Sequence, residues 1–276
     1  MRDLTFRCSS IGKLMTEPIQ IDVSLRTLEV EEIIAKKKRS DDEKLLIKSL
    51  KERTLSVGAK TYIRELAAQA IFGVDFEVSS KAMEKGIQVE QECIELLNRV
   101  RTLDLAKNLE RRANEWISGE CDLYHATARR GHDIKASWSV ATFPIAIEDC
   151  EDSLYEWQMR GYMALWDADE WEVNFCLVDT PEKLITYEPL QMHLVGHIPE
   201  HHRVTSWTVE RDREKEAAMF RKVRVARTYY AQVITEFDRS HPLHHVVAAA
   251  RRPVPIVAQA AQVIQTAARI PETIDF

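Results

Sequence analysis

The sequence predicts an α/β protein in which helices flank a mixed β-sheet. Up to about residue 100, the apolar residues recur at helical spacing. From about residue 115 they alternate with polar residues, in segments rich in Val, Ile, Trp and Phe that are bounded by Gly, Pro or Asp. A helical stretch interrupts these strand-like segments and another follows them, which indicates that helices pack on the sheet.

Helices account for the first part of the chain. Residues 25–57, which include LEVEEIIAKKK and DDEKLLIKSLKERTL, predict a polar helical arm, and Asp41 and Asp42 are good helix starts. The stretch TYIRELAAQAIFG predicts a more buried helix that ends at Gly73. Residues 79–100 predict another helix, capped by one of its two leading serines. We expect the arm to be a solvated insertion.

The strand-like segments are EWISGECDLYHA, HDIKASWSV, EVNFCLV and RVTSWTVE. The helix EDSLYEWQMRGYMALW lies between the second and the third, and a long final helix extends from about Glu210 to Phe237. We assign residues 1–240 to one domain. Residues 241–276 are assigned to a linker and a short helical tail, because three prolines there precede an alanine-rich stretch.

The composition narrows the class of protein. Apolar residues make up 45% and charged residues 30%, which is typical of a soluble globular protein and too polar for a membrane protein. The N-terminus lacks the apolar stretch of a secretory signal, so we expect a cytoplasmic protein. The five cysteines include no CxxC pair, which argues against a zinc ribbon or an iron–sulfur cluster. The net charge of -6 argues against a protein that coats nucleic acid, but it allows a basic groove.

One predicted hairpin, CDLYHATARRGHDIKAS, carries candidate catalytic residues. Residues two apart on a strand point to the same face, so Asp133 and Lys135 project together. Asp122 lies eleven positions before Asp133, and a turn around Ala128 to Gly131 brings it to the neighbouring strand. The hairpin therefore gathers two carboxylates and one ammonium in a small patch.

Two adjacent carboxylates repel each other unless a cation or a proton intervenes. Mg²⁺ or Mn²⁺ is suited to such a site, since it needs one or two carboxylates together with waters and substrate oxygens. The lysine would then lie beside metal-bound water, as phosphodiester hydrolysis requires. Taken alone, D-x-K is better explained as a surface ion pair that contributes little energy, beside an unrelated aspartate, and only the flanking elements favour a site.

Four motifs, in order, resemble the PD-(D/E)XK nuclease superfamily, and within it the phage exonucleases similar to lambda exonuclease, the YqaJ-like family. They are RCSSIGKLMT, GIQVEQECIELL, the D-(x10)-D-x-K hairpin, and YEWQMRGYMAL with its Y-x-x-Q arrangement. The resemblance covers roughly residues 7 to 180. It implies a restriction-endonuclease-like core with an N-terminal helical insertion and a C-terminal helical extension. Cys121 replaces the usual proline, and Asp133 the commoner glutamate.

The resemblance also implies roles for particular residues. The metal ligands would be Asp122, Asp133, the backbone carbonyl of Ile134, and Glu90, the last directly or through water. Lys135 would position or activate the attacking water, Gln158 would hold that lysine or the scissile phosphate, and Tyr155 would support it. The residues expected to meet DNA phosphates are Arg7, Ser9, Ser10, Lys13, Arg129 and Arg130. The segment Ser118 to Glu120 departs from the family at the 5'-phosphate pocket.

The function implied by the resemblance is that of a Mg²⁺-dependent deoxyribonuclease, in which Mn²⁺ can substitute. Members of the family digest linear duplex DNA from the 5' end, leave 3' overhangs, form rings that are often trimeric, and act with a single-strand annealing protein in recombination. We expect these substrates and partners here, and no membrane.

Three alternatives stay open. The first is a structure-specific or restriction-like endonuclease of the same fold, and the second is a non-catalytic DNA-binding scaffold. The third is a zinc site made from two histidine groups that prolines interrupt, for which surface loop histidines are the simpler explanation. The histidines are His197, His201, His202, His241, His244 and His245.

Overall fold

A computed structural model describes residues 4–76 and 79–242 of the chain. The chain divides into two compact units, residues 1–236 and 237–276, and the fold that follows is that of the first. The tail predicted for residues 241–276 lies outside the described residues from residue 243 onward. None of the described helices is long and apolar enough to cross a membrane.

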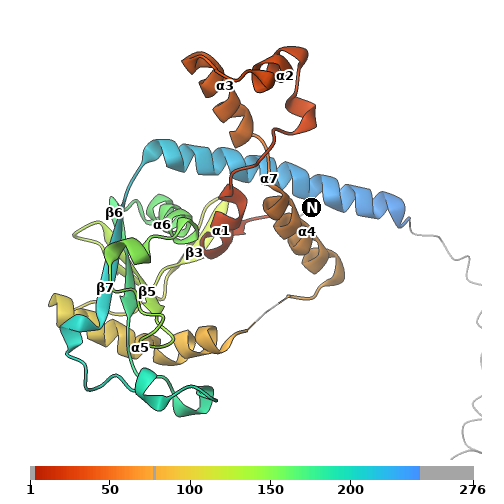
Figure 1. Ribbon diagram of the computed structural model, residues 1–276. Coiled ribbons are helices and arrows are strands. Elements are labelled where there is room, and N and C mark those ends of the chain that lie inside the picture. The colour runs from red at the N-terminus through yellow and green to blue at the C-terminus, as the bar shows by residue number, and fades with distance from the viewer. Residues whose placement is uncertain (1–3, 77–78, 243–276) are drawn as a thin grey trace, which may run out of the picture. The chain divides into compact units, whose positions relative to one another are not determined.

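The N-terminal part is helical, as predicted (Figure 1). Its α-helices are α1 (Cys8–Met15), α2 (Leu28–Ala35), α3 (Asp41–Glu52), α4 (Val57–Phe72) and α5 (Lys81–Arg101). Helices α2 and α3 form the predicted arm, which has a small core of its own around Ile21, Val30 and Leu50. Helix α4 ends at Gly73, whose φ of 66° is one that glycine adopts without strain, and Ser80 caps α5.

The helix α3 begins at Asp41, as its acidic pair predicted, and a serine caps it. Ser40 is its N-cap and forms a capping box with Glu43, in which each side chain bonds to the backbone of the other residue. Asp41 and Asp42 occupy the first turn, where negative charge favours the helix dipole. The arm is thus defined by strong local helix signals.

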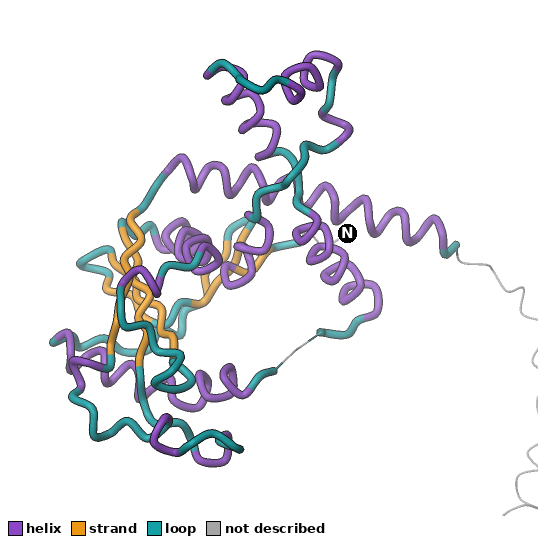
Figure 2. Tube along the Cα trace, viewed as in Figure 1, coloured by secondary structure: helices purple, strands orange, loops and turns teal. Residues whose placement is uncertain are grey.

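The strands form two small mixed sheets (Figure 2). The first has the order β1-β3-β2, from β1 (Phe6–Arg7), β2 (Arg111–Ala113) and β3 (Ile117–Glu120). The second has the order β4-β5-β6-β7, from β4 (Leu123–His125), β5 (Arg130–Ala136), β6 (Glu170–Cys176) and β7 (Val204–Glu210). Strands β5 and β6 are parallel, and their other neighbours are antiparallel.

The sequence predicted one strand where the structure has β3 and β4. The ladder is interrupted at Cys121 and Asp122, because the backbone carbonyls of both accept hydrogen bonds from Asn108 instead. The short strand β2, residues 111–113, was missed, since its arginines give no apolar alternation. The interruption matters for the site, because it frees the Asp122 side chain from the regular pleat.

Helices cover both faces of the second sheet (Figure 1). Helix α5 packs on one face of β5, where Ile134 contacts a core that includes Cys93, Leu97 and Val178. Helix α6 (Ser153–Trp166) covers the other face and also packs against α1, around Met159 and Trp171. The long helix α7 (Arg213–Ser240) contributes Val223 to this second core. The fold therefore buries β5 between two cores, with alternate residues facing each.

Candidate active site

The β4–β5 hairpin places Asp122 beside Asp133, as the sequence predicted. Leu123 pairs with His132 in an antiparallel register, so the residues before and after them, Asp122 and Asp133, are adjacent. The Asp122 Oδ2 atom accepts a hydrogen bond of 2.6 Å from the backbone N–H of Ile134. In a strand, the N–H and the C=O of one residue point to the same side, so the Ile134 carbonyl faces Asp122 too.

Asp133 is buried and is held at both carboxylate oxygens. Its Oδ1 accepts a hydrogen bond of 3.0 Å from Nε2 of Gln158, on α6. Its Oδ2 lies 2.7 Å from Nζ of Lys135, which points to the same face of β5. The same ammonium lies 4.6 Å from the ring centroid of Tyr155. The structure thus brings together Lys135, Gln158 and Tyr155 around Asp133.

The electrostatics of Asp122 are unfavourable to its ionised form. Burial, and then the nearby charge of Asp133, raise the pKa of Asp122 to about 7, and the hydrogen bond from Ile134 only partly opposes this. Two carboxylates therefore share a buried patch with a single ammonium beside them. A divalent cation would remove the repulsion, as would a proton.

Lys135 has the opposite balance. Burial by itself would lower the pKa of this lysine, but the charge of Asp133 and the hydrogen bond to it outweigh burial, and the pKa is raised. The side chain therefore stays an ammonium at neutral pH. In this state it can donate hydrogen bonds and stabilise negative charge, and it cannot accept a proton.

Glu90 lies at the rim of the patch. It forms an ion pair with Lys107, and its charge contributes to the raised pKa of Asp122. Within residues 4–76 and 79–242, no group of three or more His, Cys, Asp or Glu side chains is close enough to hold a metal. Glu90 would have to exchange its ion pair with Lys107 to bind a metal directly.

The remaining donor set fits a hard divalent cation. It consists of the carboxylates of Asp122 and Asp133 and the carbonyl of Ile134, all oxygens, as Mg²⁺ prefers. Asp133 Oδ2 is buried, and the contact that the structure gives it within the described part of the chain is the Lys135 ammonium at 2.7 Å. Two oxygen ligands from side chains are enough for Mg²⁺, which keeps several waters.

The residues implied for phosphate contact fall into two groups. The first group lies on β1 and α1 and consists of Arg7, Ser9, Ser10 and Lys13. Strand β1 pairs with β3, and β3 ends two residues before Asp122. The Lys13 ammonium lies 4.9 Å from the ring centroid of Tyr62, on α4. Burial raises the pKa of Tyr62, whereas a hydrogen bond with the Ser10 side chain and the positive charge of Arg7 lower it. Ser10 and Arg7 therefore lie near the Tyr62 side chain.

Arg129 and Arg130 lie elsewhere. Arg130 is the first residue of β5 and Arg129 is in the turn before it, at the opposite end of the strand from Lys135. Arg129 forms ion pairs with Asp167 and Asp169, and Arg130 pairs with Glu170 and with the buried Glu172. The structure does not bring these arginines to the carboxylate patch.

Those histidines that suggested zinc and lie within the described residues belong to no group of three or more metal-binding side chains. His197, His201 and His202 are exposed, and the rings of the last two are tilted by 59° with centroids 4.1 Å apart. His244 and His245 lie outside the described residues.

Sequence reasoning missed a second lysine ammonium close to the site, and this one is fully buried. Lys85, on α5, is fully buried, and its Nζ donates to the carbonyls of Ser137, Trp138 and Val178 at 2.6, 3.2 and 2.9 Å. These carbonyls lie just beyond the ends of β5 and β6. The signal was present in the sequence, because Lys85 is four residues before the core residue Val89, in its apolar stripe.

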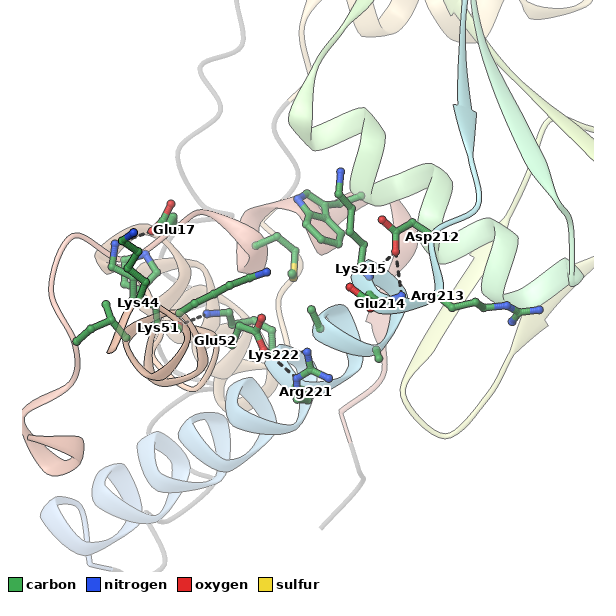
Figure 3. Close-up of a pocket in the computed structure, with 17 residues that line it drawn as sticks. Glu17, Lys44, Lys51, Glu52, Asp212, Arg213, Glu214, Lys215, Arg221 and Lys222 are labelled. Carbon is green, nitrogen blue, oxygen red and sulfur yellow. Dashed lines mark hydrogen bonds and ion pairs between the residues drawn. The ribbon is translucent and has the colours of Figure 1, made fainter. Parts of the chain in front are cut away.

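A pocket of about 1020 Å³ lies away from the carboxylates. Figure 3 shows it between helix α3 of the arm and helix α7, with charged side chains around its wall. Most of these charges are matched, as in the ion pairs Lys51–Glu17 and Arg221–Glu52. Lys222 donates to the carbonyls of Lys51 and Thr54, which fastens the arm to α7.

Comparison with solved structures identifies relatives of this chain. A phage-related exonuclease from Haemophilus somnus 129PT is 32% identical, with a TM-score of 0.70 over 85% of this chain and 97% of that one. The alkaline exonuclease LHK-Exo from Laribacter hongkongensis is 13% identical, with a TM-score of 0.54 over 86% of this chain and 93% of that one, which shows the shared fold. No protein-family model and no curated protein matches the sequence.

The first of these similarities extends over nearly the whole of a solved exonuclease, and the PD-(D/E)XK motifs lie on the elements that the sequence assigned to them. Mixed sheets flanked by helices agree with a restriction-endonuclease-like core. The chain belongs to the lambda exonuclease-like, YqaJ-like family of the PD-(D/E)XK nucleases.

Proposed function

We propose that the protein is a Mg²⁺-dependent deoxyribonuclease that hydrolyses phosphodiester bonds at the Asp122–Asp133–Lys135 patch. The observation that carries this proposal is the adjacent pair of carboxylates, Asp133 buried and Asp122 partly buried, beside an ammonium, in a chain 32% identical to a phage-related exonuclease. A divalent cation bound there would activate water as a nucleophile and neutralise charge on the phosphate.

The residues of the chain have distinct tasks in this proposal. Asp122, Asp133 and the Ile134 carbonyl hold the metal, and Glu90 binds it through water. Lys135, kept protonated by Asp133, donates from Nζ to the attacking water or to a phosphate oxygen, where negative charge increases in the transition state. Gln158 holds Asp133 in place, and the Tyr155 ring supports the ammonium.

The substrate we propose is the 5' end of linear duplex DNA, degraded in the 5'-to-3' direction to leave 3' overhangs. Arg7, Ser9, Ser10 and Lys13 would contact phosphates as charge-assisted donors, and they lie on elements adjacent to β3 and the site. The overhangs would serve recombination by a single-strand annealing partner in the cytoplasm of a bacterial or phage-infected cell. A homo-oligomeric ring, with residues 1–240 as the nuclease domain, completes the proposal.

The experiment that tests this function uses one linear duplex labelled at either the 5' or the 3' end, with a closed circular duplex as control. In Mg²⁺, we expect early release of the 5' label, an intact circle, and no release by Lys135→Ala. Early release of the 3' label would overturn the polarity. Cutting of the circle would favour the endonuclease alternative, and no cutting of either DNA would favour the scaffold.

A further inference from the structure

We propose that Tyr162 is a positioning residue of the site, which fixes the orientation of the Gln158 amide and, through it, Asp133. This inference rests on the proposed function, since it assigns a role within the same site. Tyr162 lies one helical turn after Gln158 on α6, and it is buried. The role comes from a chain of hydrogen bonds whose direction can be deduced.

The chain begins at a backbone carbonyl that can only accept. The Tyr162 hydroxyl donates to the Glu120 carbonyl at 3.1 Å, which uses its single proton. The same oxygen lies 3.2 Å from Nε2 of Gln158, so Gln158 must be the donor there. The second hydrogen of Nε2 points to Oδ1 of Asp133 at 3.0 Å.

Both partners of the amide therefore require its NH2 group. If the amide were reversed, its oxygen would face a carboxylate and a hydroxyl that has no proton left to give. The orientation that remains turns the carbonyl oxygen of Gln158 away from Asp133. There it is an acceptor for water, for the Lys135 ammonium, or for a substrate group. Tyr162 thus makes Gln158 a donor to Asp133 and an acceptor toward the reacting groups.

The same hydroxyl connects the two segments that carry the acids. Glu120 precedes Asp122 by two residues on the β3–β4 segment, and Asp133 lies on β5. Gly119 makes this approach feasible, because a Cβ atom there would lie 2.7 Å from Cε1 of the Tyr162 ring. A bulkier residue would displace the ring from the Glu120 carbonyl. Burial raises the pKa of Tyr162, so its hydroxyl keeps the proton that defines the chain.

The test is Tyr162→Phe, which keeps the ring and removes the hydroxyl. Partners that orient metal ligands typically change metal affinity or activity about 10- to 100-fold, and we expect a loss of about tenfold, because Tyr162 acts through Gln158. Mn²⁺ binding, followed by titration calorimetry without DNA, should weaken by this factor. The turnover on linear duplex should fall similarly, with little change in KM for DNA.

The matched control is Tyr124→Phe. Tyr124 also donates its hydroxyl to a backbone carbonyl, that of Trp166 at 3.2 Å, and packs in the same core, but it touches none of the site groups named above. We expect it to lower thermal stability about as much as Tyr162→Phe does, and to leave Mn²⁺ affinity and turnover unchanged. Equal effects of the two variants on Mn²⁺ affinity would reduce Tyr162 to a packing role and overturn the proposal.

A double-mutant cycle with Gln158→Ala tests whether Tyr162 acts through the amide. In the Gln158→Ala background, Tyr162→Phe should weaken Mn²⁺ binding by less than about twofold, since coupled residues are not additive. Full additivity, or Gln158→Ala with the affinity of the native protein, would contradict the proposed chain. The titration needs no nuclease activity, so it decides the role of Tyr162 even if the protein degrades no DNA.

Discussion

Two ammonium groups, the partly buried Lys135 and the fully buried Lys85, lie near opposite faces of the same strand and have opposite environments. Lys135 meets a carboxylate, Asp133, and its pKa is raised despite burial. Lys85 meets three backbone carbonyls, and burial lowers its pKa to about 8. Carbonyls satisfy hydrogen bonds without cancelling charge, so the desolvation of Lys85 is only partly offset.

This difference in environment distinguishes a lysine with a structural role from a lysine with a role in the proposed reaction. Lys85 fastens α5 to the ends of β5 and β6, and its hydrogen bonds are complete without a ligand. The patch around Lys135 has two acids for one ammonium, so it retains negative charge that a cation can match. A lysine among carbonyls therefore indicates an anchor, whereas a lysine beside excess carboxylates indicates a site that binds and reacts.

The largest expected effect compares Lys135→Met with Lys85→Met. Loss of a positioned donor from the reacting groups typically costs 10²- to 10⁴-fold in rate, and we expect about this for Lys135→Met in saturating Mg²⁺. Lys85→Met should stay within about threefold of the native rate, because Lys85 touches no reacting group. Initial rates on a 5'-labelled duplex measure both. Equal losses would remove the distinction between the two lysines.

The next effect concerns pH and Asp122. The folded protein raises the pKa of this carboxyl from 3.8 to about 7, so the protonated form stabilises the fold. This contribution to the free energy of unfolding is complete below about pH 4. It falls by about 1.4 kcal/mol per pH unit between about pH 4 and about pH 7, and it is lost once the pH has risen through about 7. Without metal, Asp122→Asn should thus be more stable than the native protein at pH 8.

Urea unfolding at pH 4, 6 and 8 checks this prediction. The stability advantage of Asp122→Asn should shrink as the pH falls, because the native carboxyl regains its proton. Glu110→Gln, at an exposed residue whose pKa is lowered by Arg112, is a suitable control and should show no such advantage at pH 8. An advantage for Asp122→Asn that is the same at every pH would show that charge on Asp122 is not its cause.

Metal should stabilise the native protein by a smaller amount. A ligand that binds only the folded state, at 100 times its dissociation constant, adds about 2.7 kcal/mol. We expect this gain with Mn²⁺ at pH 8, and little or none in Asp133→Asn, where one ligand charge is lost. Chemical denaturation with and without Mn²⁺ measures it. A gain that survives in Asp133→Asn would place the bound metal elsewhere.

The smallest effect is that of Lys85→Met on stability. The variant leaves three buried carbonyls without their donor, and an unsatisfied buried group costs about 1–3 kcal/mol. We expect a loss in that range, reduced because methionine removes the desolvated charge. Urea denaturation at pH 7 measures this loss of unfolding free energy. Lys183→Met, at an exposed position, serves as the control. Unchanged stability would contradict the anchor role.

Local signals predicted much of the fold and of the patch. The helical periodicity of residues 25–57 and the alternation around Asp133 and Lys135 required no tertiary information, and both were confirmed as elements. The hairpin spacing placed Asp122 beside Asp133 because an antiparallel register follows from the turn. These predictions succeeded because sequence-local geometry controls them.

Other features depend on contacts between distant segments. Arg129 and Arg130 are basic residues in the hairpin, but their partners Asp167, Asp169 and Glu170 come from the turn before β6 and its first residue. The interruption between β3 and β4 depends on Asn108, which the strand pattern does not include. The Tyr162 hydrogen bond to Glu120 joins residues 42 apart. No spacing rule within one segment could reveal these partners.

The central claim is that Asp122 and Asp133 jointly bind a divalent cation. Its most direct test is the anomalous diffraction of a crystal of the protein grown with Mn²⁺. The account predicts a peak bonded to both carboxylates and to the Ile134 carbonyl, with Lys135 alongside. A crystal in which Mn²⁺ is bound elsewhere, or in which Asp122 still accepts from Ile134 N–H with no metal between the two acids, would contradict it.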